Sequence, residues 1–271
     1  MRNRKVSSSA DPIAPETLGF EDCPGGWLKT VGGPPLRFAR LRSRLDLTET
    51  ERLQKSVFGV SDHDLISSSI LVTVHETGGE VLGAFDGERL GGFVSGWGGY
   101  VDGRARIVSD LMAVEVGYRG GIGVTLKGLQ AVVASQTGFE EIVWTVDPLR
   151  AANARLNFER LGAFARKYLR NVYGDDYGEG LYGGLTSDRL FITWPLRSVR
   201  VRSRLLGAYE PLAPVALAAL PEYAPGTSES RSASPSPVTS TGSSPPIRPR
   251  RMSGVFGSEK SSRRRSHPAT L

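Results

Sequence analysis

The chain has 271 residues, a formal net charge of +6, three histidines and one cysteine. A single Cys23 excludes an intramolecular disulfide, and the scattered histidines lack the spacing of metal ligands, so we expect no metal site. No apolar run approaches the length of a membrane span, and no apolar segment follows the basic N-terminus as in a signal peptide. We therefore expect a soluble, cytoplasmic protein without a membrane partner.

Composition divides the chain into a central domain and two polar ends. In residues 1–33, serine, proline and glycine break any periodicity, which predicts a flexible extension with apolar residues able to dock on the domain: Phe20, Trp27 and Leu28. Residues 208–271 are rich in Ser, Pro and Arg and hold too little apolar surface to offset ordering entropy. We predict a disordered basic tail there and a folded domain over residues 34–207. Because much of the excess charge lies in the tail, we expect no specific nucleic-acid partner.

The first half of the domain shows alternating strand and helix patterns. Residues 36–41 alternate apolar and basic side chains, which predicts a half-buried strand. Thr48 with Glu51 three residues later matches a capping box and predicts a helix through about Phe58. Residues 67–77 have helical spacing, and a glycine pair ends that helix.

A hairpin and a second turn follow. Asp86-Gly87 lies between two apolar runs, residues 81–85 and 90–97, and this is a strong hairpin signal. Gly98, Gly99 and Asp102-Gly103 predict another turn, which leads into a buried strand over residues 107–116.

The stretch from Tyr118 to Gly123 joins this strand to a helix predicted over residues 124–137. Glycine permits positive φ and close backbone approach, and the free N–H groups of the helix start point at any anion in the loop. A pyrophosphate fits that description. The spacing matches neither a P-loop nor a dinucleotide fold.

The remaining elements are a strand over residues 141–146, a helix over 151–161 and strand segments over 164–173 and 190–196. Hairpins in the first part of the domain, followed along the chain by a strand–helix–strand crossover, predict an α/β fold. We expect a mixed, mostly antiparallel central sheet flanked by helices, with disordered termini.

About half of the chain resembles the GNAT acyltransferase superfamily, in particular a bacterial branch of predicted acetyltransferases. The matching segments are Gly79, Gly83-Ala84-Phe85-Asp86, Tyr118-Arg119-Gly120-Gly121-Ile122-Gly123, Thr145, Asp147-Pro148-Leu149, Asn153-Ala154, Leu156-Asn157-Phe158, Leu161-Gly162-Ala163, Tyr173-Gly174, Asp188-Arg189-Leu190 and Trp194. The glycine turn here is one residue shorter than the superfamily pattern Gln/Arg-x-x-Gly-x-Gly/Ala.

The resemblance implies acetyl-CoA as a co-substrate. The cofactor-binding candidates are backbone groups at Met112 and Val114, the turn residues Arg119, Gly120, Gly121, Ile122 and Gly123, and the amides of Asn153 and Asn157. The catalytic candidates are Asp110, as the base that deprotonates the acceptor ammonium, and its neighbour Ser109. A structural role for the Asp110 carboxylate and a capping role for the two asparagines stay open as alternatives.

No tyrosine occupies the position where many family members place the acid for the departing thiolate, because this chain has Phe158 there. The substitutes left open are Tyr168, Tyr173, Tyr177 and Tyr182, each of which would otherwise be a structural tyrosine.

Three functions compete on this sequence. The first is an acetyl-CoA-dependent N-acetyltransferase acting on a primary amine of a small molecule or protein. The second is a non-catalytic GNAT-like acyl-CoA-binding or regulatory module, which the shorter turn and Phe158 favour. The third gives the basic tail the active role, as a tether to nucleic acid or acidic partners. We favour the first, and the sequence leaves the acceptor and a homodimer open.

Overall fold

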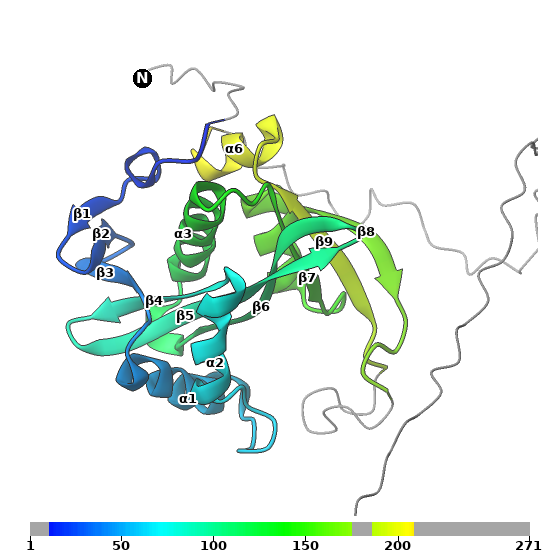
Figure 1. Cartoon of the computed structure of the whole chain (residues 1–271), viewed down its shortest axis with the longest axis horizontal. Coiled ribbons are helices and arrows are strands. Elements are labelled where there is room, and N and C mark those ends of the chain that lie inside the picture. The colour runs from blue at the N-terminus through cyan, green and yellow to red at the C-terminus, as the bar shows by residue number, and fades with distance from the viewer. Residues whose placement is uncertain (1–10, 175–185, 209–271) are drawn as a thin grey trace, which may run out of the picture. The chain divides into compact units, whose positions relative to one another are not determined.

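The protein, described here from a computed structural model over residues 11–174 and 186–208, is built on one nine-stranded sheet. The strand order is β1-β2-β3-β4-β5-β6-β7-β9-β8 (Figure 1). All neighbours are antiparallel except β6 and β7, which are parallel. The strands are β1 (Glu21–Cys23), β2 (Gly26–Thr30), β3 (Pro35–Arg40), β4 (Glu80–Asp86), β5 (Arg89–Val101), β6 (Arg104–Val114), β7 (Glu141–Val146), β8 (Phe164–Leu169) and β9 (Arg189–Pro195). The predicted mixed, mostly antiparallel sheet is confirmed.

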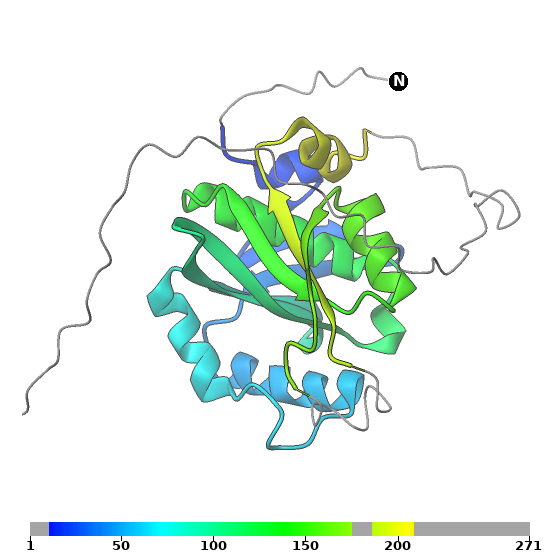
Figure 2. The same cartoon turned by 90° about the vertical axis from the view of Figure 1, so that its right-hand side faces the viewer.

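Helices cover both faces of this sheet (Figures 1 and 2). One face carries α1 (Arg44–Phe58) and α2 (Ser68–Val74), which η2 (His75–Thr77) extends. The other face carries α3 (Ile122–Gln136), α4 (Ala151–Ala154) with the π-helical turn η4 (Arg155–Arg160), and α6 (Val199–Leu205). The remaining 3₁₀ turns are η1 (Pro15–Leu18) and η3 (Val116–Tyr118).

The alternation of side chains along the strands divides the core into two clusters. Val81 and Phe93 pack under α1 and α2, whereas their neighbours Leu82 and Val94 pack under α3. All four are fully buried, and each such side chain is worth about 1.5–3 kcal/mol when removed from water. The helix α3 is apolar on nearly all sides because η1 and α6 cover its back.

The N-terminal residues that we expected to be a flexible extension instead contribute two strands. β1 and β2 pair with each other and β2 pairs with β3, so the sheet begins well before residue 34. Phe20 is 2% exposed and meets Phe38 edge-on with 5.4 Å between ring centroids. The missed signal is Pro24-Gly25, since proline followed by glycine at positive φ suits a tight turn between two short strands. The predicted tail lies outside the described residues except for Ala208.

Two local predictions also need correction. The helix α1 begins at Arg44, and its N-cap is Ser43, whose Oγ accepts the N–H of Asp46 at 3.0 Å, not Thr48. The capping-box pattern placed the start too late, because Thr48 lies inside the helix and its hydroxyl donates to the Arg44 oxygen at 2.9 Å. Gly98 and Gly99 lie inside β5, and the turn is made by Asp102-Gly103 alone, both at positive φ as a two-residue hairpin requires.

Candidate functional site

The sheet splits between β6 and β7. These parallel strands pair only at Ile107 with Ile142 and at Val108 with Val143. Beyond that point β6 continues beside β5, and β7 continues beside β9. The facing edges of the two strands are therefore free of each other over the rest of their length.

A β-bulge marks the start of the split. Asp110 and Leu111 of β6 together stand opposite the single Ser95 of β5. A bulge changes which face each side chain points to. Ser109 faces α3, where it bonds to that helix, and Met112 packs on the same side, while Leu111 packs with the cluster under α1 and α2.

A pocket of about 140 Å³ occupies the split. Its walls come from β6, β7, α3 and the α4–η4 segment, and its lining residues are Ser109, Asp110, Leu111, Met112, Lys127, Trp144, Val146, Asn153, Leu156 and Asn157. Five of the residues chosen from the sequence thus meet in one pocket: Ser109, Asp110, Met112, Asn153 and Asn157. Val114 lies further along β6 and does not line it.

The two catalytic candidates stand in different surroundings. Asp110 is on the open side of the pocket, and enclosure by the walls still raises the pKa of its carboxyl above the ordinary value. Ser109 is buried, and its Oγ donates to Oε1 of Gln130 at 3.1 Å. Asp110 is therefore accessible to an incoming amine, whereas the Ser109 hydroxyl is engaged with α3.

The two asparagines lie one turn apart and line the same pocket. Asn157 is 2% exposed and sits in the π-helical turn, whose wider winding is a frequent feature of functional sites. Among the described residues its side-chain amide has no hydrogen-bond partner, and its main-chain oxygen accepts the N–H of Ala163. The amide is thus free to bond a ligand in the pocket.

Sequence reasoning missed Lys127, which projects from α3 into the pocket wall. Its Nζ donates to Ser109 Oγ at 2.7 Å and to Gln130 Oε1 at 3.0 Å, and it lies 4.1 Å from the centroid of the Trp144 ring. Burial lowers the pKa of this lysine from 10.5 to about 7. The available signal was a lysine interrupting the apolar run from Val124 to Ala134.

Glu80 was also missed, because it follows a glycine pair and reads as a turn residue. It begins β4, is 2% exposed and lies 3.5 Å from Nη1 of Arg40. Within the described part of the chain neither carboxylate oxygen has a hydrogen-bond partner. Burial raises the pKa of Glu80 from 4.5 to about 8, although the charges of Arg40 and Lys127 act in the opposite direction.

The glycine turn follows the C-terminal end of β6, between η3 and α3. Gly120 and Gly121 have φ of 115° and 141°, values that only glycine adopts without strain. The Gly121 oxygen accepts the N–H of Thr125 at 2.9 Å, so α3 starts directly after the turn. The N–H groups of its first turn have no acceptor within the helix and form its positive end.

A second pocket, of about 380 Å³, borders this turn. Arg119, Gly120 and Ile122 line one side, and residues 31–34 between β2 and β3 line the other. A side chain at Gly120 would meet nothing within 4 Å, so the backbone there is open to a ligand. Gly121 and Gly123 do not line the pocket, and Gly123 packs against Met112. Asp86 also lines the pocket, and its carboxylate accepts the hydroxyl of Tyr118 at 3.1 Å.

Met112 and the N-terminal turn of α3 lie between the two pockets. Met112 lines the split, and its Cε would be 3.3 Å from a Cβ at Gly123. The absence of a side chain at Gly123 therefore leaves room for Met112 next to the turn.

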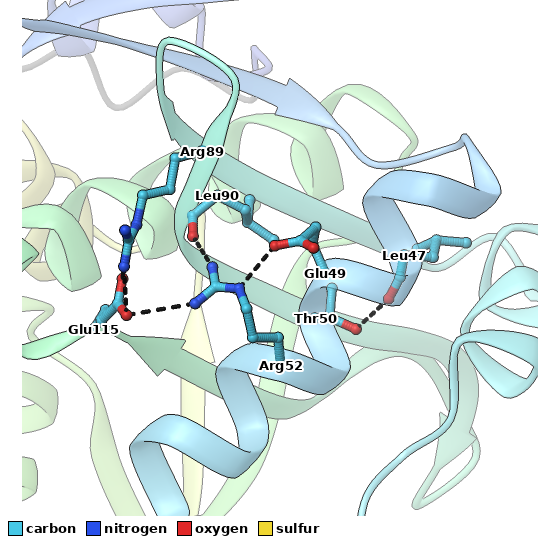
Figure 3. A network of polar contacts seen from close by, with 7 residues as sticks. All are labelled: Leu47, Glu49, Thr50, Arg52, Arg89, Leu90 and Glu115. Atoms are coloured by element: carbon cyan, nitrogen blue, oxygen red, sulfur yellow. Dashed lines mark hydrogen bonds and ion pairs between the residues drawn. The ribbon is translucent and has the colours of Figure 1, made fainter.

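A polar network fixes the end of β6 just before the turn (Figure 3). Arg89 donates through Nη2 to both carboxylate oxygens of Glu115 at 2.9 Å, and Arg52 of α1 approaches the same carboxylate at 3.4 Å. Arg52 also donates to the Leu90 oxygen at 2.8 Å and to Glu49 at 2.8 Å. The network joins α1, the β4–β5 hairpin and the start of the turn.

Of the candidate acids that the structure describes, Tyr168 and Tyr173, neither lines the pocket in the split. Phe158 packs against the core under α3. Tyr168 and Tyr173 are about half exposed, and the Tyr168 hydroxyl is bonded to Asp188. Tyr177 and Tyr182 lie outside the described residues.

No protein-family model matches the chain, and no curated protein sequence matches it. Among solved structures, similar ones are acetyltransferases of the GNAT family, the superfamily that the sequence motifs resemble. A ribosomal-protein-alanine N-acetyltransferase from Brucella melitensis is 19% identical, with a TM-score of 0.47, over 59% of this chain and 98% of that one. The ribosomal-protein-S18-alanine N-acetyltransferase from Escherichia coli is 18% identical, with a TM-score of 0.46, over 59% and 94%.

A candidate acetyltransferase from Salmonella typhimurium, solved with its cofactor acetyl-CoA, is 16% identical, with a TM-score of 0.47, over 59% of this chain and 94% of that one. Identities below 20% with TM-scores below 0.5 carry nothing about the function or the substrate of this chain. In the described residues, no helix is long and apolar enough to cross a membrane.

Proposed function

We propose that this protein transfers an acetyl group from acetyl-CoA to a primary amine of a small molecule or protein. The observation that carries the proposal is the split between β6 and β7, which leaves two strand edges facing a narrow pocket. Free strand edges present N–H and C=O groups, and these suit the two amides of a pantetheine arm. The amides of Asn153 and Asn157 supply further partners from the α4–η4 side.

The glycine turn would hold the pyrophosphate. The positive end of α3 and the open backbone at Gly120 favour an anion, and the exposed Arg119 adds a charge beside them. Met112 then connects this end of the ligand to the split. Backbone N–H groups of β6 at Met112 and Val114 are the candidates for polarising the thioester oxygen.

Asp110 would accept the proton from the acceptor ammonium. Its carboxyl lies on the open side of the pocket, and the rise of its pKa makes it a better base than an ordinary aspartate once ionised. The amine then attacks the thioester carbon, a new C–N bond forms and the C–S bond breaks. CoA leaves as its thiolate, the nitrogen of the new C–N bond releases its second proton to water, and the first proton stays on Asp110 until it is passed on.

The test is calorimetric titration of acetyl-CoA and free CoA into the full chain, because β1 and β2 belong to the sheet. Arg119→Glu should weaken binding by about tenfold or more, since a hydrogen bond to a charged group contributes about 1.5–3 kcal/mol. Arg104→Glu is the matched control, because Arg104 is an exposed arginine at the opposite end of β6. It should leave binding unchanged.

Turnover is then read as thiol release with a panel of primary amines: a polyamine, an aminoglycoside and peptides with free N-termini. Asp110→Asn should lower turnover by about 10²-fold with binding preserved. Absence of binding at millimolar acetyl-CoA would overturn the proposal. Binding without thiol release from any amine would instead support a non-catalytic acyl-CoA-binding module.

A further inference from the structure

Lys127 is a buried cation in a place where a structural core would use an apolar residue. It is 4% exposed and sits on the sheet side of α3. Among the described residues no carboxylate lies within ion-pair distance of its Nζ. Burying a charge without a paired counter-ion is costly, and leucine or methionine would fill the same volume without that cost.

The contacts of Lys127 suit a protonated amine. Ser109 Oγ and Gln130 Oε1 each accept one N–H, and the face of the Trp144 ring attracts the positive charge. Ser109 and Gln130 are also hydrogen-bonded to each other, because the Ser109 hydroxyl donates to the same Gln130 oxygen. The group is held as a proton donor at the closed end of the split, on the opposite side of β6 from the packing of Leu111.

We propose that Lys127 donates the proton that converts the departing CoA thiolate into a thiol. The proposal rests on the proposed function, and it assigns a proton donor at the pocket, which neither of the described candidates Tyr168 and Tyr173 lines. When the C–S bond breaks, its electron pair stays on sulfur, and sulfur takes a proton from Nζ. The amine of Lys127 is then neutral, and it regains a proton from Asp110 or water, so protons balance over the cycle.

The acidity of the group matches this step. Burial lowers the pKa of Lys127 to about 7, below the value of about 8.5 for an ordinary thiol, so transfer to the thiolate is downhill. The charged groups that face it are Glu80 from β4, which raises this pKa, and Asp110 from β6 at the same pocket. The pocket-lining residues of β7 and of the α4–η4 segment are uncharged.

The first experiment measures the pKa of the thiol of CoA bound to the full chain, from the ultraviolet absorbance of the thiolate. A neighbouring ammonium stabilises the thiolate, so we expect a thiol pKa at least one unit below that of free CoA. Lys127→Met should abolish the shift, and Lys55→Met, an exposed lysine on α1, should not. An unchanged thiol pKa in the wild-type complex overturns the proposal even where Lys127→Met fails to fold.

The second experiment varies the leaving group. Turnover is compared for acetyl-CoA and for the acetyl thioester of 4-nitrothiophenol, whose acidic thiol leaves without a proton. Lys127→Met should lower turnover of acetyl-CoA by about 10²-fold and leave that of the aryl thioester nearly unchanged. The acceptor is the best amine of the panel, or water.

The outcomes separate the two proposals. Equal losses with both thioesters would show a structural role for Lys127 and overturn the inference while leaving acetyl transfer intact. If the wild-type protein binds CoA with a lowered thiol pKa but shows no turnover, the transferase function is overturned. The contact between Lys127 and sulfur would still be supported. Lys127→Arg, which keeps the charge but does not release a proton, should lower acetyl-CoA turnover while preserving the thiol pKa shift.

Discussion

The face of the sheet under α1 and α2 and the face under α3 are both apolar, but they treat polar side chains differently. Under α1, Gln54 is bonded at both ends to Ile66, through its oxygen at 2.8 Å and its nitrogen at 2.9 Å. Thr50 likewise donates to the Leu47 oxygen (Figure 3). Under α3, Glu80 has no hydrogen-bond partner among the described residues, and Lys127 has no ion pair there.

The difference shows on which face of the sheet buried polar side chains lower the stability of the fold. A buried polar group without a partner costs about 1–3 kcal/mol, and more when it is charged. On the α1 face both Gln54 and Thr50 are hydrogen-bonded, so neither carries this cost. On the α3 face the groups that lower the stability are Lys127, which lines the pocket in the split, and Glu80. The unfavourable burial of charge therefore occurs at the candidate site.

The largest expected effect is on the apolar α1 face. Phe93→Ala should lower the free energy of unfolding by about 3–5 kcal/mol, because the ring is fully buried in that cluster. Urea denaturation measures it, with Val72→Ala, a half-exposed residue on α2, as the control expected to cost little. Acetyl-CoA affinity of the folded fraction should be unchanged. A loss of affinity matching the loss of stability would break the comparison of the two faces.

A smaller effect, on the order of a few kcal/mol, is expected from Glu80 on the α3 face. Its pKa is about 8 in the folded protein against an ordinary 4.5, so the folded state holds the proton more tightly. The stabilisation is therefore complete below about pH 4.5 and is lost as the pH rises through 8. Glu80→Gln should flatten this dependence, whereas exposed Glu76→Gln should not.

Lys127 defines the pH window for that measurement. Its pKa falls from 10.5 to about 7, so the destabilisation it causes is complete below pH 7 and disappears as the pH rises towards 10.5. Between about pH 4.5 and 7, of these two groups only Glu80 changes its contribution, so the comparison with Glu80→Gln isolates it. Urea denaturation across this interval should show falling stability in the wild type. A flat profile would mean that Glu80 is charged in the folded state.

The smallest effect tests the start of α1. Ser43→Ala should cost about 1 kcal/mol, because Ser43 Oγ accepts the N–H of Asp46. Thr48→Ala should cost less, since the Thr48 hydroxyl donates only to the Arg44 oxygen one turn back on an exposed face. Thermal denaturation of both variants decides between them. A larger loss for Thr48→Ala would restore the helix start that the capping-box pattern predicted.

Sequence patterns predicted those parts of the fold that depend on neighbouring residues. The hairpin at Asp86-Gly87, the helices α1 to α3 and the glycine turn follow from local turn chemistry and periodicity. The β1–β2 hairpin was missed although Pro24-Gly25 gives a local signal, because its strands are only three and five residues long. Short strands gain their stability from pairing with β3, which no local pattern contains.

The candidate site shows the same division. Asn153 and Asn157 were found in the quoted motifs and Asp110 and Met112 from the superfamily resemblance, and the structure places all four on one pocket. Lys127 and Glu80 were not found, because a lysine within an apolar helix and a glutamate after a glycine pair have no distinctive spacing. Their importance comes from burial, which depends on the packing of η1 and α6 over α3 and of α3 over β4.

By itself, then, the sequence determined the order of strands and helices from β3 to β9, the glycine turn and the residues that carry the superfamily resemblance, since each depends on contacts within about one turn or one hairpin. The tertiary structure alone decided where β6 and β7 separate and which charges are removed from water. Both depend on pairing and packing between segments far apart in the chain, where solvation and strand register are set by every neighbour at once.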